Sequence, residues 1–354
     1  MEEKKDTLGM LDLVIRPGFC VKENQIIKVN QAAESLFITP GTDVRSLLLT
    51  GSEEYAAFTG GCLYLTLSLS SHSCGASVTR VDDIDVFLLE QESDNGELRS
   101  MALAARELRE PLTNVMITAD SLFPLCAAES SPRTAEQVAR LNRGLFQILR
   151  IIGNMSDAER CAAVSRQETV DIPALFAEFF EKAETLVSHT GITLTYEGPD
   201  QPIYGLADRE QLERAVLNIL SNAIKFTPKG GTVTARLTRS GRMLRLSVTD
   251  SGSGIAQSVR SSVFSRYLRQ PALEDSRYGI GLGMVLIRTA AAHHGGAVLI
   301  DQPEGVGTRI TMTMSIRQSK QATLRSNVLR VDYAGERDHG LIELSECLPT
   351  ELYE

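Results

Sequence analysis

The sequence predicts a multidomain α+β protein, and three patterns along the chain indicate this fold class. Residues 10–92 contain short alternating runs of apolar and polar residues, which are typical of strands joined by turns. Residues 101–162 carry two successive series of apolar residues at heptad spacing, which predicts a helical hairpin. From 168 to 317 amphipathic helices alternate with strands, so we expect a two-layer α/β sandwich there. The 354 residues suit two or three such modules at ~100 to 200 residues each.

The overall composition is that of a globular protein and excludes several classes. Hydrophobic residues at 43% and charged residues at 23% exclude a disordered or collagen-like chain. A formal charge of -9 argues against a surface that coats nucleic acid. No apolar run approaches the ~18 residues of a membrane span, and the first residues lack a secretory signal. We therefore expect a cytoplasmic protein with no membrane insertion, whose six scattered cysteines are reduced thiols.

The first module has the alternation of a sheet. Leu63, Leu65, Leu67 and Leu69 alternate with polar residues or tyrosine, which predicts a half-buried strand. Upstream, residues 26–37 resemble the start of a PAS domain, in which a strand turns into a helix and an asparagine, here Asn30, ties down the turn. This resemblance implies a PAS-like sensor domain at 10–92, preceded by an extension at 1–9. A generic sheet that only spaces or dimerises its neighbours remains an alternative.

A polar linker is expected at 93–100, followed by the helical hairpin. The first apolar series is Met101, Ala105, Leu108, Leu112, Val115, Ala119 and Leu122, and the second is Val138, Leu141, Leu145, Ile148, Ile152 and Met155. We call these series the apolar stripes. Neither helix alone can bury both flanks of its stripe, so two antiparallel hairpins are expected to pair into a four-helix bundle. Pro111 lies inside the first helix and predicts a kink there.

A polar stripe lies on an otherwise apolar helix in the third module. Asn218, Asn222 and Lys225 are spaced at i, i+4 and i+7, so they share one face of that helix. Amide oxygens are adequate ligands for Mg²⁺, and a lysine close by can reach a phosphate. The polar stripe alone is also compatible with an ordinary solvated helix face.

Three glycine-rich patches follow the polar stripe in the sequence. Asp250 begins a turn after a strand, and Gly252 and Gly254 let the backbone approach a flat ligand while the carboxylate accepts from an exocyclic amine. A second patch opens a helix, where exposed N–H groups attract phosphate; its glycines are Gly279, Gly281 and Gly283. The third patch, at 305–308, ends with Thr308 and leads into the last strand.

In this order and spacing, the four patches resemble the N, G1, G2 and terminal Gly-Thr boxes of the ATP-binding domain of histidine kinases, gyrases, heat-shock chaperones and mismatch-repair ATPases. The resemblance covers about residues 168–317, and residues 264–269 resemble the F-box of the same family. It implies ATP and Mg²⁺ as cofactors, with Asp250 reading adenine and Asn222, helped by Asn218, holding Mg²⁺. The other implied contacts are phosphate-facing Lys225, Arg266 and Arg269, a phosphate-side turn of Gly279, Gly281 and Gly283, and Thr308 in the adenine pocket. Residues 270–278 would form a lid.

The hairpin resembles the dimerisation and phosphoacceptor domain of histidine kinases. Residues 105–112 read Ala-Arg-Glu-Leu-Arg-Glu-Pro-Leu, where the family motif reads Ser-His-Glu-Leu-Arg-Thr-Pro-Leu. Arg106 therefore stands at the position of the phosphoacceptor histidine. A guanidinium has no available lone pair and stays protonated, so Arg106 cannot accept the γ-phosphoryl group by that route. All five histidines lie outside the hairpin: His72, His189, His293, His294 and His339.

The acidic neighbours of Arg106 also bear on activity. Glu107 is the only catalytic candidate in the hairpin, because it holds the position of the general base in the resemblance. It could equally be a solvated carboxylate without a nucleophile to assist. Glu110 replaces the Thr or Asn that orients water for phosphatase activity in the family, and its charge would repel an aspartyl phosphate.

These observations imply a sensor histidine kinase family protein of two-component type. We expect it to bind Mg-ATP, to be unable to autophosphorylate at the usual hairpin position, and to act as a pseudokinase-like regulator. The expected partners are a second chain in a homodimer or heterodimer, and a response regulator or partner kinase. Two alternatives stay open: an active kinase that phosphorylates a partner in trans, and a structural interaction module. The tail at 318–354 begins basic and ends acidic, and its pattern predicts no function.

Overall fold

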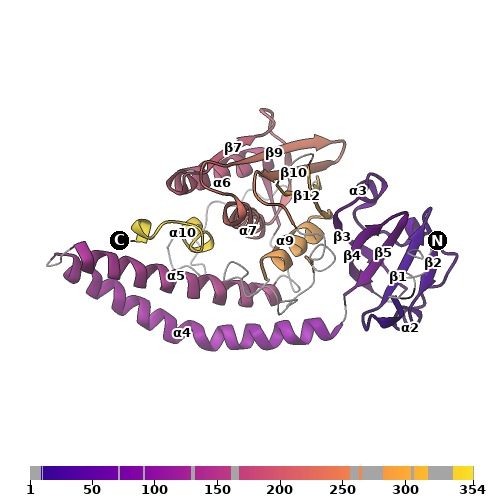
Figure 1. Ribbon diagram of the computed structural model, residues 1–354, viewed down its shortest axis with the longest axis horizontal. Coiled ribbons are helices and arrows are strands. Elements are labelled where there is room, and N and C mark those ends of the chain that lie inside the picture. Colours follow the sequence, from indigo (N-terminus) through magenta and orange to yellow (C-terminus); the bar gives the residue numbers. More distant parts are fainter. Residues whose placement is uncertain are drawn as a thin grey trace.

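The computed structural model describes residues 9, 11–70, 72–90, 92–128, 132–160, 167–255, 263–264, 282–303, 307–317 and 338–353. Figure 1 shows a sheet-rich N-terminal module beside a second module of strands and helices, with a long helical hairpin that runs below the second module and reaches the edge of the N-terminal one. The chain is thus a multidomain α+β protein, as the sequence predicts.

The N-terminal module is an antiparallel sheet with short helices. Its strands are β1 (Gly18–Lys22), β2 (Gln25–Val29), β3 (Cys62–Ser68), β4 (Ser73–Val81) and β5 (Ile84–Leu89); its short helices are α2 (Gln31–Glu34) and α3 (Ser52–Ala56), with 3-10 turns at Leu11–Leu13 and Val44–Leu47. Phe19 and Phe87 stack at the centre of the core, with ring centroids 4.7 Å apart. Asn30 caps α2, since its Oδ1 accepts from the N–H groups of Ala33 and Gly18, both at 3.0 Å. The expected anchoring role of Asn30 is confirmed.

One expectation for β3 is wrong in part. Leu63, Leu65 and Leu67 are buried, as the alternation predicts, but Tyr64 on the opposite face is buried as well. The guanidinium of Arg288 lies over the Tyr64 ring at 4.9 Å from its centroid. Both faces of β3 are therefore covered, because the second module packs on the face that the sequence pattern assigns to solvent.

The hairpin consists of α4 (Glu92–Ala128) and α5 (Pro132–Arg160). The interval 93–100, expected to be a linker, is helical and forms the first turns of α4. The helix also continues without a break through Pro111. A helical rather than flexible junction connects the N-terminal sheet directly to the hairpin.

In its described residues, the second module has three helices on a mixed sheet. The helices are α6 (Ile172–Val187), α7 (Arg209–Phe226) and α9 (Leu282–His293), with a 3-10 turn at Ser188–Thr190. The strands are β6 (Glu168–Asp171), β7 (Thr193–Glu197), β8 (Tyr204–Ala207), β9 (Thr232–Ser240), β10 (Met243–Asp250), β11 (Val298–Asp301) and β12 (Arg309–Ser315). β6 and β8 form a small separate sheet. Buried apolar faces of α6, α7 and α9 pack against the larger sheet, which makes the expected sandwich.

The two modules share one continuous sheet of ten strands. Its order is β2-β1-β5-β4-β3-β11-β12-β10-β9-β7, and the join is the antiparallel pairing of β3 with β11, in which Leu63 lies opposite Leu299. Beside the join, buried Arg288 of α9 pairs with Glu90, which also accepts from the Tyr64 hydroxyl at 3.0 Å. The N-terminal module is thus fixed to the second module by backbone pairing and by an ion pair between buried Arg288 and partly buried Glu90.

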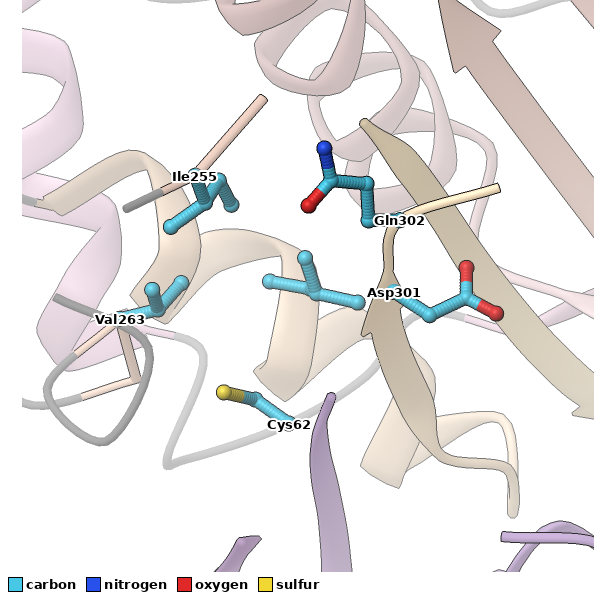
Figure 2. A pocket seen from close by; sticks show the side chains of 6 residues that line it. Cys62, Ile255, Val263, Asp301 and Gln302 are labelled. Atoms are coloured by element: carbon cyan, nitrogen blue, oxygen red, sulfur yellow. The ribbon is translucent and has the colours of Figure 1, made fainter. Parts of the chain in front are cut away.

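A small pocket opens at this join, as Figure 2 shows. It is lined by Cys62, Ile255, Val263, Ile300, Asp301 and Gln302. The carboxylate of Asp301 points away from the pocket and accepts from Arg309 Nε at 2.8 Å. The pocket is therefore mainly apolar, with the Gln302 amide as its polar neighbour.

The last described residues, 338–353, fold onto the hairpin and the second module. They contain α10 (His339–Glu343) and a 3-10 turn at Thr350–Tyr353, and α10 contacts α5, α6 and α7. In Figure 1 this stretch, coloured yellow, lies between α5 and α7. We call residues 338–353 the distal segment. Within the part of the chain that the structure describes, no helix is long and apolar enough to cross a membrane.

Candidate nucleotide-binding site

The polar stripe lies on the face of α7 that meets α9 and the distal segment. Asp208 begins α7 by accepting from the Gln211 N–H at 3.2 Å, an N-cap that satisfies a free backbone donor. Asn218 is 1% exposed, and its amide donates to the Arg214 carbonyl at 2.9 Å. Asn222 lies one turn further on, where its amide approaches the Met284 sulfur of α9 at 3.9 Å. Sulfur is a weak acceptor, so the Asn222 amide is available to a better ligand.

The acidic candidate Asp250 ends β10, which lies between β12 and β9 in the sheet. Its Oδ1 accepts from the N–H groups of Gly252 at 2.8 Å and Thr308 at 3.2 Å, which holds the turn and the start of β12 together. Neither bond uses Oδ2. Burial raises the pKa of Asp250, and these two N–H bonds offset that effect only in part. The carboxylate is thus oriented by one oxygen and can accept a ligand amine through the other.

Glycine contacts bring the four patches together. A Cβ on Gly252 would lie 2.5 Å from the Phe226 carbonyl oxygen, so the turn after Asp250 packs against the end of α7. A Cβ on Gly283 would lie 2.9 Å from Asn218 Oδ1, so the start of α9 packs against the polar stripe. Side chains at either position would separate these elements. The chain therefore assembles α7, the turn after β10, the start of α9 and the start of β12 around one region.

The other residues expected at this site divide into two groups. Gly254 lies in the turn after Asp250 with φ of 75°, and Thr308 is buried at the start of β12. The remaining candidates lie outside the described residues: Arg266, Arg269, Gly279 and Gly281, with the lid expected at 270–278.

The two hairpin candidates are not close to the polar stripe. Arg106 and Glu107 are exposed on α4, and α5 lies between α4 and α7 in Figure 1. No histidine lies in the hairpin sequence. In this conformation, Arg106 and Glu107 on α4 therefore lie apart from the polar stripe on α7.

Two acidic residues at this site were not predicted from the sequence. Glu346 of the distal segment pairs with Lys225 at 2.8 Å, and Glu343 accepts from Asn218 at 3.4 Å. Glu343 is fully buried, which is rare for an ionisable side chain without partners. The apolar residues spaced around these two glutamates are compatible with a short packed helix. That pattern does not indicate which surface the helix contacts.

The described residues also show what kind of cation this region fits. No group of three or more His, Cys, Asp or Glu side chains gathers in a metal-binding arrangement within the described ranges. Amide oxygens such as that of Asn222 suit a hard cation that keeps most of its bonds to phosphate and water. The amide oxygen of Asn222 is thus compatible with a hard cation such as Mg²⁺.

Comparison with known proteins agrees with this geometry. Residues 207–318 match the family model described as histidine kinase-, DNA gyrase B- and HSP90-like ATPase. An uncharacterized sensor-like histidine kinase of Rhizobium meliloti is 29% identical over 73% of this chain and 52% of its own length. Residues 207–318 therefore form a histidine kinase-like ATPase domain, and the chain around it is similar to sensor-like histidine kinases.

Two further comparisons define the extent of the similarity. The adaptive-response sensory kinase SasA of a Synechocystis strain is 30% identical to this chain over 61% of the chain and 58% of SasA. The crystal structure of full-length ShkA in complex with AMPPNP has the same fold, with a TM-score of 0.51 and 24% identity over 64% of this chain and 47% of ShkA. The chain thus spans a little over half the length of the first two curated relatives.

Proposed function

We propose that this histidine kinase family chain binds Mg-ATP beside the polar stripe and regulates a partner without phosphorylating its own hairpin. One observation carries the proposal: the close packing of Gly252 and Gly283 against α7 gathers four separate patches around one region. A family match alone would not supply this, since a fold can be kept after its ligand is lost.

Each described candidate has a chemical role in this proposal. Asp250 Oδ2 would accept from the exocyclic amine of adenine, while Thr308 supports the same pocket. Asn222 would hold Mg²⁺ through its amide oxygen, and Lys225 would contact phosphate. Asn218 is buried and donates to the Arg214 carbonyl, so its contribution is to position α9 rather than to reach far into solvent.

Arg106, which stands at the phosphoacceptor position, would prevent phosphorylation of the hairpin. Arg106 is exposed and permanently protonated, so it can neither attack a phosphoryl group nor be converted into a nucleophile by Glu107. The proposed output is a change of hairpin packing, which a dimer partner, a partner kinase or a response regulator would read. Such a shift requires only that nucleotide bind one conformation better than another.

Calorimetric titration of the full chain with Mg-ATP at up to millimolar concentration tests the proposal. The Asp250→Asn variant is expected to lose most of the binding, because asparagine keeps the Oδ1 acceptor for Gly252 and Thr308 but presents a donor to the adenine amine. A loss of tenfold or more, about 1.4 kcal/mol, is expected for such a mismatch. The matched control is Asp200→Asn, which changes an exposed aspartate outside the site.

Two outcomes would contradict the proposal. One is that calorimetric titration with Mg-ATP gives no heat of binding for any protein in which Asp250, Asn222 and Lys225 are intact. The other is a phosphate found by mass spectrometry on residues 101–162 after incubation with Mg-ATP, since that would supply the acceptor that Arg106 cannot be.

A further inference from the structure

The distal segment is an ordered, well-packed part of the molecule. Asp338 caps α10 by accepting from the Leu341 N–H at 3.0 Å. Tyr353 is 2% exposed, its ring meets that of Phe146 edge-on at 5.2 Å, and its hydroxyl donates to the Leu341 carbonyl at 2.8 Å. Ile342, Leu344 and Leu348 are also buried. These contacts give the distal segment a defined position between α5 and α7.

The distal segment brings two carboxylates to the polar stripe. Glu346 accepts from Lys225 at 2.8 Å and pairs with Arg150 Nη1 at 3.1 Å. Glu343 accepts from Asn218 at 3.4 Å and pairs with the guanidinium groups of Arg214 and Arg150. Two of the three residues of the polar stripe are thus engaged by oxygens that carry negative charge.

The same contacts tie the hairpin to the second module. Arg143 of α5 donates to the Ser345 carbonyl at 2.9 Å, to the Glu346 carbonyl at 3.1 Å and to the Thr350 hydroxyl at 3.3 Å. Asn142, one residue earlier, donates to the Tyr353 carbonyl at 2.9 Å. Arg143 therefore holds the backbone of the distal segment without contacting the polar stripe itself.

We propose that the distal segment is a built-in competitor of the nucleotide, which must leave the polar stripe before Mg-ATP phosphates can reach Lys225. This inference rests on the proposed function, since it names the regulation of the same site. A carboxylate is an oxyanion, as a phosphate is, and both take the same charged donors. When Glu346 holds Lys225, an incoming phosphate loses that donor and also meets a like charge.

The balance of charge favours an ionised, docked segment near neutral pH. Burial opposes ionisation of Glu346, but Arg150 and Lys225 outweigh burial, and the pKa of Glu346 is lowered overall. The distal segment holds four acidic residues and neither Lys nor Arg; they are Asp338, Glu343, Glu346 and Glu351. Phosphate groups of a nucleotide would compete for the donors that Glu343 and Glu346 now use.

Two variants of the full chain test the inference, and each weakens the docking of the distal segment in a different way. Glu346→Gln removes the carboxylate from Lys225, and Arg143→Ala releases the segment's backbone from α5. If the open form is about a tenth of the population, each variant is expected to tighten Mg-ATP binding by up to about tenfold. Arg143→Ala is the sharper test, because losing a positive charge would by itself weaken the binding of a polyanion.

Each variant has a matched control in the same element. Glu351→Gln makes the same change at an exposed site of the distal segment, and Arg140→Ala removes an exposed arginine of α5 that pairs only locally with Glu136. Both controls are expected to bind Mg-ATP as the unmodified chain does. Circular dichroism and thermal melting establish that every variant is folded before titration.

A direct readout follows the segment itself. Hydrogen exchange of residues 338–353 is expected to accelerate when Mg-ATP is added to the full chain, because displaced backbone amides lose their protection. The inference would be overturned if hydrogen exchange of residues 338–353 did not change on adding Mg-ATP and if Glu346→Gln and Arg143→Ala bound Mg-ATP with unchanged affinity. Nucleotide binding by the full chain would still support the proposed function in that case. Absence of binding in all variants that retain Asp250 would instead contradict the proposed function.

Discussion

At the scale of single residues, His294 connects two elements of the nucleotide-binding module. It is 2% exposed, its Nε2 accepts from the Asp208 N–H at 3.0 Å, and its Nδ1 lies 2.7 Å from the Ala290 carbonyl, to which it donates. These bonds require the neutral ring with its proton on Nδ1. Burial lowers the pKa of His294, and the interactions with Ala290 and Asp208 offset that only in part. His294 is thus a packing residue that supports the start of α7.

This environment predicts acid sensitivity of folding. An unfolded histidine has a pKa near ~6.5, so below that pH the unfolded chain binds a proton that folded His294 does not, and the free energy of unfolding falls as pH drops. His294→Phe is expected to flatten this dependence and to cost about 1–3 kcal/mol at pH 7.5, because two backbone groups lose a partner. Urea unfolding at pH 7.5 and 5.5 measures both effects.

The control for this experiment is the exposed His189→Phe, which should leave the pH dependence unchanged. Burial also lowers the pKa of His293, so some slope persists in His294→Phe. A slope identical to that of the unmodified chain would show that His294 does not carry the effect.

At the scale of elements, the hairpin buries only alternate members of its apolar stripes. Ala105, Leu112 and Ala119 of α4 are buried against α5, whereas Leu108, Val115 and Leu122 are each at least half exposed. On α5 the same alternation leaves Leu141 and Ile148 exposed, while Leu145 and Ile152 are buried. A second hairpin would cover these residues, which supports the proposed dimer.

The exposed half of the stripe predicts how dimerisation can be broken. Charges on it would have to lose their water in a four-helix bundle, so Val115→Glu combined with Leu122→Glu is expected to shift the chain from dimer to monomer. Light scattering coupled to size exclusion gives the mass of each species. Thr113→Glu is the matched control, since it lies two residues from Val115 and so about 200° around the helix. A monomeric unmodified chain would contradict the prediction.

At the scale of the whole molecule, the pairing of β3 with β11 joins the N-terminal module and the second module in one sheet. The contacts between them are buried: Arg288 is 4% exposed, donates to the Phe264 carbonyl at 3.0 Å and pairs with Glu90. Removing one partner of a buried ion pair leaves the other charge unpaired. The stability of the two modules is therefore linked through α9.

The Arg288→Ala variant tests this linkage. It is expected to destabilise the molecule by about 1–3 kcal/mol, since the partly buried Glu90 carboxylate loses its guanidinium partner. In scanning calorimetry the N-terminal module should then melt separately and earlier. Combining Arg288→Met with Glu90→Leu should recover part of the loss, because no lone charge remains buried. Equal melting profiles for Arg288→Ala and the unmodified chain would refute the linkage.

Local pattern accounts for the parts of this molecule that were predictable. Heptad spacing gave the two hairpin helices, and the polar stripe at i, i+4 and i+7 identified the face of α7 that lies at the candidate site. Asn30 was recognised because a helix cap acts within three residues of its own position. In each case the interacting residues are near one another in sequence.

Long-range pairing accounts for what was missed. Nothing in the sequence of β3 says that its free edge pairs with β11, more than two hundred residues later, so Tyr64 was assigned to solvent. Arg150 and Glu343 are likewise 193 residues apart, and the sequence around each of them predicts an ordinary charged side chain on the surface. Sequence therefore predicted the elements and the polar stripe, but not the partners that dock on them.

The shared sheet has a practical consequence for anyone who cuts this chain into fragments. In the intact molecule only the outer strands β2 and β7 end the ten-stranded sheet. Excising the module that begins near residue 168 would strip β3 from β11 and leave a row of unsatisfied amide and carbonyl groups along Val298–Asp301. An unpaired edge strand of this kind can pair with other chains and so promotes aggregation. Fragments that retain residues 18–90 keep the native edge strand β2 and should therefore aggregate less at high concentration than fragments that omit them.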